Sequence, residues 1–484
     1  LRYNINELRM LTGDIERDNI YTTITHDFDN GVEAFGEVAY YASQYNSYFG
    51  PNVISDVNKM YIPADAYYNP FGPVGSAQRL AGLDLADVPA EGLNVKIDRL
   101  RLYDTGPRTI AVDSSSYRFV SGLRGEFEGW DWESAIFYSA AESTDSQLSV
   151  SRSQFYEAVS RTTPDAYNPF TGGNPDDVAN GDPTSGGDAS EFTVDVEREN
   201  KTRISGIDLK ISRPSLFSLP GGDVGAAFGL EQRRETYDDD RDPTLDGTIT
   251  FTHPLSGEFF DSDIMGVSAT PDTEGSREVY SAYAEFLVPL VSEHQEIPLI
   301  RSLDAQLAIR GESYSDVSDD ILKPKVALSW RPTDWLQVRS AWSKGFRAPN
   351  LETLNLTVQE RFNNNQEDFL RCATGQAVGT PEADVDACTT SIITRRLGNS
   401  DLEPEESENL TFGVVIEPTF IEGLTVTLDW WEIEQEGVVG LFGRDNHLLL
   451  DQAMRFQGST NPAVVRSAAT AQDQAEMTAY NVAN

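Results

Sequence analysis

The segment KVALSWRPTDWLQVRSAW, residues 325–342, decides the fold of this chain. Apolar side chains recur at every second position on both sides of its centre: Val326, Leu328 and Trp330 before it, and Leu336, Val338 and Trp342 after it. Successive side chains of a β-strand point to opposite faces, so this alternation predicts two strands, each with an apolar and a polar face. Residues Arg331–Asp334 between them predict a short turn.

The same alternation occurs in segments along the whole chain. About twelve segments of roughly ten residues show it. They are residues 20–28, 32–44, 116–127, 130–144, 201–213, 223–237, 277–289, 302–314, 322–331, 335–346, 407–417 and 424–436. Only residues 451–456 and 463–480, rich in Ala and Gln, predict helices. The sequence therefore predicts an all-β, antiparallel protein.

The connections between these segments mostly alternate between short and long. The short ones are residues 29–31, 128–129, 214–222, 331–334 and 418–423, and the long ones are residues 45–115, 145–200, 238–276 and 347–406. Two depart from the pattern: residues 290–301 are of middling length, and residues 315–321 are short where a long loop is due. A soluble sandwich has little reason to place four long loops at one end. Short periplasmic turns opposite long extracellular loops are typical of outer-membrane β-barrels.

Tryptophan placement supports the barrel. All seven tryptophans fall on predicted strands. Those close to a short turn are Trp130, Trp132, Trp330 and Trp335, and those further from one are Trp342 and Trp430. Two aromatic levels are typical of girdles at the two membrane interfaces. The alternative is that these are ordinary core tryptophans.

Charge and motif content exclude several function classes. The 484 residues include 78 acidic and 37 basic ones, a net charge of −41, so nucleic acid, which needs a basic footprint, is not an expected partner. No Walker loop, nucleophile elbow, His-Glu-x-x-His or Cys-x-x-Cys motif occurs, so we expect no enzyme, catalytic residue, metal or cofactor. Neither a long apolar helix nor an apolar leader is present, which predicts either a cytosolic protein or a mature or truncated piece.

One short repeat occurs in two of the predicted long loops. Residues 65–72 read DAYYNPFG, and residues 165–172 read DAYNPFTG. Asn-Pro followed by an aromatic residue is turn chemistry, so a shared loop conformation is one interpretation. The other is that its aromatic side chains contact a ligand at the outer face: Tyr67, Tyr68, Phe71, Tyr167 and Phe170.

The long loops are also acidic. Residues 145–200 contain 11 Asp or Glu and three Arg. A solvated surface explains such a charge run. The alternative is that cations bridge these carboxylates to the phosphates of neighbouring lipopolysaccharide.

Two stretches resemble the barrels of TonB-dependent receptors. WLQVRSAWSKGFRAPNL, residues 335–351, is similar to the strand of that family that ends in Gly-Phe-Arg-Ala-Pro. NSDLEPEESEN, residues 399–409, is similar to the Leu-x-Pro-Glu-x-Ser segment that begins the next strand of the family. Both occur in the family's order, and less specific matches run through residues 117–138 and 280–310.

This resemblance implies a transmembrane β-barrel in the bacterial outer membrane that takes up a scarce, bulky ligand. Ligands in the family include siderophores, haem, cobalamin and oligosaccharides. The implied partners are the energy-transducing complex TonB–ExbB–ExbD, acting through a plug, and outer-membrane lipid with lipopolysaccharide. The acidic loops disfavour anionic ferric complexes, whereas the tyrosine-rich residues 40–48 and 61–71 suit stacking on sugars or other ring systems.

The chain departs from the family pattern in three ways. The family has a barrel of 22 strands, an N-terminal plug and a TonB-contacting box, and outer-membrane barrels commonly end in an aromatic residue. This sequence shows about twelve strands, neither plug nor box, and a last residue Asn484. We therefore expect residues 1–484 to be a partial barrel domain from a longer receptor.

Two other functions share part of the pattern. A passive outer-membrane porin would have the same strands and loops, and a gene that encodes no plug would favour it. A soluble secreted β-protein with an adhesive or structural role would share the alternation. Partition of the native protein into water without detergent would favour that third function.

The two cysteines, Cys372 and Cys388, lie in a polar stretch with loop composition. Two thiols with no histidine nearby are too few for a structural zinc site, which leaves a disulfide or two free surface thiols. We expect the disulfide, which implies an oxidising compartment. By the chain-entropy model it contributes roughly 3 kcal/mol to the local order of the loop.

Reduction, or the double substitution Cys372→Ser, Cys388→Ser, is expected to loosen residues 354–395 and to leave the barrel folded. The reason is that a barrel is stabilised by its hydrogen-bond ladder and not by its loops. Limited proteolysis with and without reductant measures the effect. Two reactive thiols in protein isolated without reductant would contradict the bridge.

Overall fold

The structure is a computed structural model that describes residues 9–55, 58–170, 188–317, 320–370 and 389–468, together with residues 471, 474–475 and 478. The chain divides into two compact units. The first comprises Leu1–Thr357 and Gly398–Val438, and the second comprises Val358–Leu397 and Val439–Asn484.

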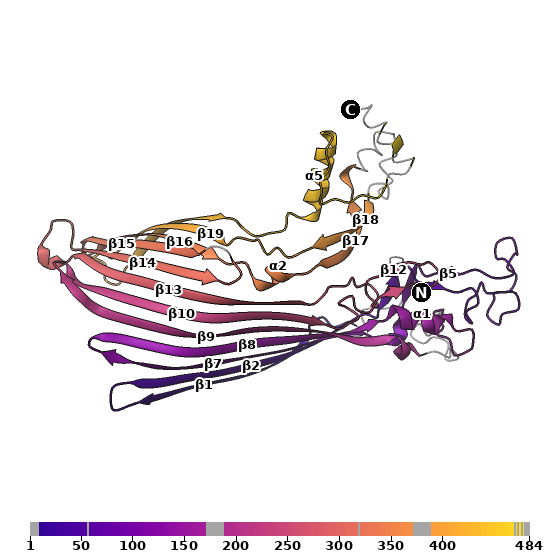
Figure 1. The fold of residues 1–484 in the computed structure, drawn as a ribbon, viewed down its shortest axis with the longest axis horizontal. Coiled ribbons are helices and arrows are strands. Elements are labelled where there is room, and N and C mark those ends of the chain that lie inside the picture. Colours follow the sequence, from indigo (N-terminus) through magenta and orange to yellow (C-terminus); the bar gives the residue numbers. More distant parts are fainter. Residues whose placement is uncertain are drawn as a thin grey trace. The chain divides into compact units, whose positions relative to one another are not determined.

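A single antiparallel sheet of twelve strands makes up most of the first unit (Figure 1). The strands follow one another in chain order, and each pairs with its neighbours in that order, so that β1 and β20 form the two edges. They are β1 (Asp14–Asp27), β2 (Glu33–Phe49), β7 (Arg108–Phe127), β8 (Trp130–Val150), β9 (Thr193–Leu219), β10 (Gly222–Arg241), β13 (Thr273–Val291), β14 (Ser302–Tyr314), β15 (Ile321–Thr333), β16 (Leu336–Arg347), β19 (Glu405–Ile416) and β20 (Val426–Glu436). The prediction of twelve antiparallel strands is confirmed.

Several strands extend further toward the long loops than the apolar alternation predicts. β9 begins at Thr193, and β10 continues to Arg241. Around Arg198 on β9 and residues 238–241 on β10 the side chains are charged on both faces, so the hydropathy pattern breaks there although the backbone ladder continues. The Nε of Arg198 donates to Oδ1 of Asp239 at 2.6 Å and so joins the two extensions. A pattern that reads hydrophobicity does not detect strands held together by ion pairs.

Turns and long loops lie at opposite ends of the sheet, as predicted (Figure 1). Residues 128–129 and 220–221 each form a two-residue turn at one end. Trp335 lies in another such turn and not on a strand, because the ladder between β15 and β16 ends at the pair Thr333 and Leu336. The short connection predicted near residues 315–321 is also present, between Tyr314 and Ile321.

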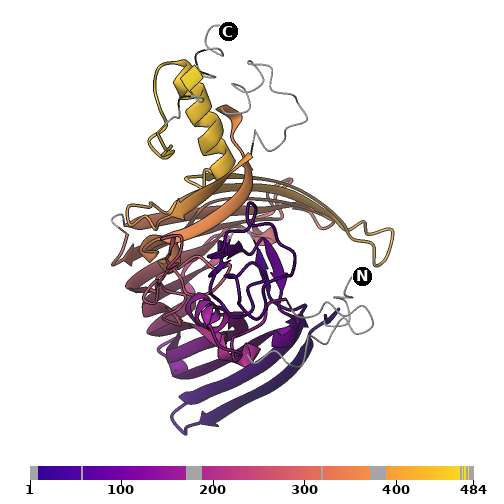
Figure 2. The same cartoon turned by 90° about the vertical axis from the view of Figure 1, so that its right-hand side faces the viewer.

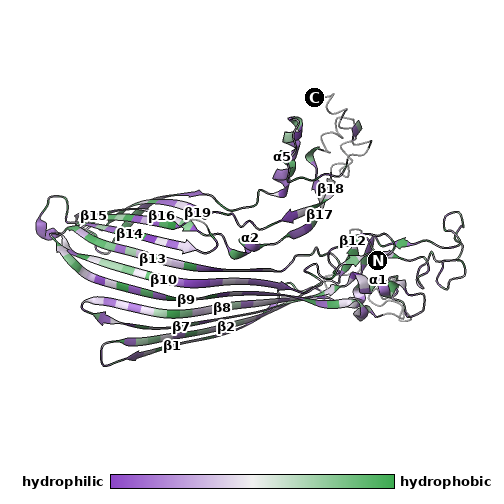
Figure 3. Cartoon of the chain, in the orientation of Figure 1, coloured by the Kyte–Doolittle hydropathy of each residue, from purple (hydrophilic) through white to green (hydrophobic). Residues whose placement is uncertain are grey.

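The register divides the side chains of the sheet into two faces. Residues directly opposite each other in an antiparallel pair lie on the same face. Following these pairs places the predicted apolar set on one face: Leu307, Val326, Leu328, Val338, Phe412, Val414, Val426 and Leu428. It places the predicted polar set on the other: Gln306, Lys325, Arg339, Thr411 and Thr427. Figure 3 shows apolar and polar residues alternating along the strands.

Within the described residues, the apolar face of the sheet has no covering layer. Leu307 is 43 % exposed and Leu428 is 65 % exposed. In a soluble sandwich the apolar faces of the sheets are buried against each other. An uncovered apolar face is the arrangement of a sheet that faces lipid.

On the polar face, long side chains reach across an intervening strand. Arg339 on β16 and Asp429 on β20 form an ion pair of 2.8 Å, although β19 lies between them. The pair passes over Gly413 of β19, where a Cβ atom would lie 2.2 Å from Oδ1 of Asp429. A side chain at this position would therefore displace the ion pair.

Short hairpins and helices occupy the loops of the first unit. β3 (Val53–Ser55) pairs with β6 (Arg99–Arg101), β4 (Tyr61–Ile62) with β5 (Val95–Lys96), and β11 (Phe251–Thr252) with β12 (Phe259–Phe260). The helical elements are α1 (Arg152–Ser160), α2 (Leu351–Asn355), η3 (Tyr103–Thr105), η4 (Ala189–Glu191) and η5 (Glu293–Gln295). Each is too short for its hydropathy period to be read from the sequence.

The second unit contains the hairpin β17 (Gln359–Glu367) and β18 (Thr389–Arg396) and the helix α5 (Arg444–Phe456). The predicted helix at residues 451–456 is confirmed and begins earlier. The helix predicted from residue 463 is wrong for residues 463–468, which are not helical. Buried Asp451 accepts from the Asn461 backbone N–H and the Arg466 side chain, and these bonds fold this stretch back onto α5. Across the described residues, no helix combines the length and apolar character needed to cross a membrane.

The two motif stretches meet at the loop end of the sheet. Arg347, in Gly-Phe-Arg-Ala-Pro, lies opposite Glu405, in Leu-x-Pro-Glu-x-Ser, and the two side chains form an ion pair of 2.7 Å. The long insertion between the motifs therefore leaves and rejoins the sheet at the same position.

The assignment of faces predicts different effects for two neighbouring arginine substitutions in β19. Phe412→Arg places a charge on the apolar face and is expected to cost about 2–4 kcal/mol near the membrane centre. Thr411→Arg places the same charge on the polar face and is expected to be tolerated. The yield of assembled, heat-modifiable barrel in the outer membrane measures both. Equal yields would contradict the assignment.

Candidate functional site

Three long loops at one end of the sheet fold together into a compact structure, the loop cap, formed by the described parts of residues 50–107, 151–192 and 242–272 (Figure 2). Its buried core draws on all three loops: Ile54, Met60, Ile62, Leu102, Phe155, Val159, Tyr167, Phe192 and Phe251. Unlike the sheet, the cap buries its apolar side chains. It is therefore built as a water-soluble domain is built.

Helix α1 begins the second loop of the cap directly after β8. Ser151 is its N-cap, and its Oγ accepts the backbone N–H of Gln154 at 3.2 Å. The same hydroxyl donates to Oδ2 of Asp263 in the third loop at 2.5 Å. One serine thus ends the strand, starts the helix and joins two loops.

Arg152 is only 3 % exposed and connects all three loops. Its Nη1 donates to the backbone oxygen of Asn58 at 3.3 Å, and its Nε donates to that of Ser262 at 3.2 Å. The guanidinium carbon lies 4.0 Å from the ring centre of Phe260. Burial lowers the pKa of Arg152 to about 10, and Asp263 opposes that shift. The role of Arg152 in the cap is therefore structural.

His253 is fully buried and lies among aromatic rings of the first and second loops. Its ring centre is 5.3 Å from that of Tyr61 and 4.9 Å from that of Tyr156. The backbone N–H groups of Tyr61 and Leu255 face its Nε2 and Nδ1 at 3.3 and 3.2 Å. Burial lowers the pKa of His253 below its ordinary value. A neutral imidazole has one acceptor nitrogen and can accept one of these two N–H groups, whereas an imidazolium can accept neither. The neutral ring therefore fits this site better.

The two copies of the sequence repeat adopt the same turn and lie next to each other. The side-chain oxygens of Asn69 and Asn168 accept the backbone N–H groups of Phe71 and Phe170 at 2.8 and 3.0 Å. The hydroxyl of Tyr68 donates to the backbone oxygen of Pro164, just before the second copy, at 3.2 Å. The predicted shared turn is present in both loops.

The five predicted ligand-contacting residues differ in exposure. Phe170 is 47 % exposed, whereas Tyr67, Tyr68 and Phe71 are half-buried. Tyr167 is 4 % exposed, lies in the core against Phe155 and Phe192, and donates to Oδ1 of Asp104 at 2.9 Å. Burial raises the pKa of the Tyr167 hydroxyl. In this structure, then, four of the five residues retain surface for a ligand.

Comparison with known protein families gives one match. The model of the family described as "TonB dependent receptor-like, beta-barrel" matches residues 77–467, well over half of the chain. The chain belongs to this family. The resemblance of the two motif stretches is thereby confirmed, and so is the prediction of an all-β barrel fold.

Solved receptors show a distant likeness. The chain is 12 % identical to the siderophore receptor PirA from Acinetobacter baumannii (TM-score 0.42, covering 87 % of this chain and 43 % of PirA). It is 13 % identical to a mutant of the ferric enterobactin receptor PfeA from Pseudomonas aeruginosa (TM-score 0.42, covering 87 % of this chain and 42 % of PfeA). It is 11 % identical to the RagAB peptide importer (TM-score 0.44, covering 87 % of this chain and 40 % of the RagAB chain). The chain thus spans less than half the length of these structures. No curated protein matches it.

The polar face of this TonB-dependent receptor chain carries a charged network near the loop end. Arg233 on β10 pairs with Glu231 and Glu235 at 2.8 and 2.7 Å, and Arg277 on β13 pairs with Glu235 at 2.7 Å. Arg277 also donates to the backbone oxygen of Pro349 in the first motif at 2.7 Å. The network therefore connects the polar face of the sheet to the start of the loop that follows β16.

Sequence reasoning did not identify Arg152 or His253 as important residues of the receptor. Ser151 with Gln154 three residues later is a helix N-cap signal and could have revealed α1 and, with it, Arg152. Nothing near His253 in the sequence marks it, because its neighbours come from distant loops.

Cys372 and Cys388 lie outside the described residues. In the described part of the chain, no group of three or more His, Cys, Asp or Glu is placed to hold a metal ion.

Acidification is expected to loosen the loop cap around His253. Since burial lowers its folded-state pKa, the stabilisation is fully present above the unfolded-state pKa of about 6.5. It is lost progressively as the pH falls from there through the folded-state pKa. Hydrogen exchange of the amides in residues 251–260, corrected for its intrinsic pH dependence, measures the loosening.

Two histidine variants control this experiment. His253→Phe keeps an aromatic ring but removes the titrating group, so the acid response should disappear. His294→Gln changes an exposed histidine at the opposite end of the sheet and should leave the response intact. An unchanged response in His253→Phe would contradict the role of His253.

Proposed function

We propose that this chain forms part of the barrel wall and the outer loops of an outer-membrane receptor that imports a bulky ligand by TonB-dependent transport. The observation that carries the proposal is the two-faced sheet: its apolar face is uncovered, its opposite face carries ion-pair networks, and its family is that of TonB-dependent receptor barrels. Such a wall separates lipid from a polar lumen.

The loop cap supports a role in ligand capture. Its three loops share a buried core and are joined by Arg152, Ser151 and His253. Loops held in one conformation before binding lose less entropy when a ligand binds. A preformed cap is therefore suited to capture of a scarce ligand at the cell surface.

The surface of the cap favours a ligand with ring systems, such as an oligosaccharide or another bulky ring-bearing molecule. The repeats place Phe71 and Phe170 on identical turns of adjacent loops, and Tyr67 and Tyr68 lie beside them with ring centres 4.8 Å apart. Aromatic faces bind sugars and other rings through stacking and apolar contact. The acidic surroundings disfavour strongly anionic ligands.

Energy coupling is tested by growth on a panel of compounds, each supplied as the only source of one nutrient. The panel consists of ferric siderophores, cobalamin and defined oligosaccharides. Deletion of the receptor gene is expected to abolish growth on at least one of them at limiting concentration, and inactivation of TonB should abolish it equally. A passive porin would lose growth on deletion but not on loss of TonB. That result would contradict the proposal.

The aromatic contacts are tested on the source identified in this way. The double variant Phe71→Ala, Phe170→Ala is expected to weaken binding by roughly 1–3 kcal/mol, or roughly 5- to 150-fold, since each stacked ring contributes about 0.5–1.5 kcal/mol. Phe420→Ala, which removes an 84 % exposed ring from a turn at the opposite end of the sheet, is the control. Equal affinity of the two variants in equilibrium binding would exclude the repeats as the ligand site.

A further inference from the structure

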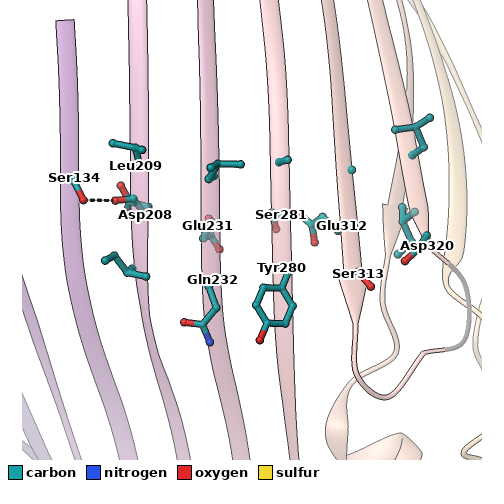
Figure 4. A pocket seen from close by; sticks show the side chains of 16 residues that line it. Ser134, Asp208, Leu209, Glu231, Gln232, Tyr280, Ser281, Glu312, Ser313 and Asp320 are labelled. Carbon is teal, nitrogen blue, oxygen red and sulfur yellow. Dashed lines mark hydrogen bonds between the residues drawn. The ribbon is translucent and has the colours of Figure 1, made fainter. Parts of the chain in front are cut away.

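A groove of 860 Å³ lies on the apolar face of the sheet, over β8 to β15 (Figure 4). One row of in-register residues crosses it: Ser134, Leu209, Leu230, Ala282, Gly311 and Leu322. Ala282 and Gly311 form its floor on β13 and β14. The larger side chains of Leu230 and Leu322 rise on either side of this floor. The groove therefore results from two small residues in a row of large ones.

The groove has an apolar and a polar end. Toward the short turns it continues along the apolar residues Phe228, Ala284 and Ile309. Toward the loops it reaches the next row, where Gln232, Tyr280 and Ser313 line its rim. This polarity matches a molecule with a hydrocarbon chain and a polar head.

Two arginines extend from the same face just beyond the polar end. Arg234 lies two residues beyond Gln232 on β10, about 7 Å further along the strand, and Arg203 on β9 lies opposite Thr236 in the following row. Both side chains are exposed. Arg234 is 3.8 Å from Glu278, and Arg203 has no ion-pair partner within the part of the chain that the structure describes. In a chain of net charge −41, two arginines with free donors beside an apolar groove indicate an anionic head group.

We propose that this groove binds one lipid of the outer membrane, with an acyl chain over Ala282 and Gly311 and a phosphate of its head group at Arg203 and Arg234. The inference rests on the proposed function, because it requires the apolar face to lie against the bilayer. A lipid fits better than another protein here, since the face is open along the described part of the sheet and the two exposed arginines lie at the polar end. Arg213, on the same face beyond the apolar end, is engaged with the Trp130 ring and the Ser215 backbone oxygen. Glu278 also lies at the polar end, where it accepts from Gln232 at 2.7 Å and orients that amide toward the rim.

Filling the groove is possible without strain, which makes the proposal testable. A Cβ atom at Gly311 would lie 3.7 Å from the nearest atom of Leu322, an ordinary contact, and Gly311 has no positive φ. Gly36 on β2 lies on the same face of the sheet, and a Cβ there would lie 3.6 Å from the backbone oxygen of Val120. Gly311→Leu therefore fills the groove, and Gly36→Leu is a matched control away from it.

The experiment is native mass spectrometry of the full receptor extracted from its outer membrane in mild detergent, with identification of the retained lipid. We expect one phosphorylated lipid per wild-type receptor, and retention at least about tenfold lower in Gly311→Leu, Ala282→Leu. Arg203→Gln and Arg234→Gln should each lower retention roughly fivefold, the effect of one cation on an anionic lipid. Gly36→Leu should retain lipid as the wild type does.

Several outcomes would overturn the proposal. They are a wild-type receptor without lipid, a retained lipid that lacks phosphate, equal losses in Gly311→Leu and Gly36→Leu, and a receptor dimer that Gly311→Leu dissociates. Uptake assays on the same variants separate this inference from the proposed function. Loss of the lipid from the groove variants with uptake intact supports the lipid site. Retention of the lipid by a receptor that shows no TonB-dependent uptake would contradict the proposed function and leave the lipid site standing.

Discussion

The hydrogen-bond ladder of the twelve-stranded sheet is the constraint on which the rest of the structure depends. Lipid offers no partners for backbone N–H and C=O groups, so strands that face it must bond to one another. A chain that pairs each strand with the next satisfies this requirement with the shortest connections. The register of the ladder then assigns every side chain to one face, which makes the position of Leu307 on the apolar face inseparable from that of Gln306 on the polar face.

The same chain uses opposite rules in its two parts. In the sheet, apolar side chains lie on the uncovered outer face and ion pairs such as Arg339–Asp429 lie on the other face. In the loop cap, Phe155 and Phe192 are fully buried in an apolar core. The solvent explains the difference, since the hydrophobic effect that closes the cap in water is absent where the sheet meets lipid.

Buried polar groups give the cap its specific arrangement. Apolar contacts are not directional, so a core of Ile, Phe and Val would tolerate several relative positions of the three loops. Arg152 and His253 remove this freedom, because their donors and acceptors are satisfied only when backbone groups of other loops lie within hydrogen-bond distance. On the sheet, the small residues Ala282 and Gly311 have a comparable effect on shape, since they leave space where neighbouring rows are filled.

The sequence alone determined the strands, their order and the face on which each side chain lies, because period-2 alternation and short turns are local properties. It also determined the family, through two motifs that are continuous in sequence. Only the tertiary structure decided how the loops are built: that Tyr167 is buried while Phe170 is exposed, that Arg152 joins three loops, and that β9 and β10 continue beyond their apolar segments. These features depend on contacts between residues far apart in the chain, whose side chains have no period that a local pattern could reveal.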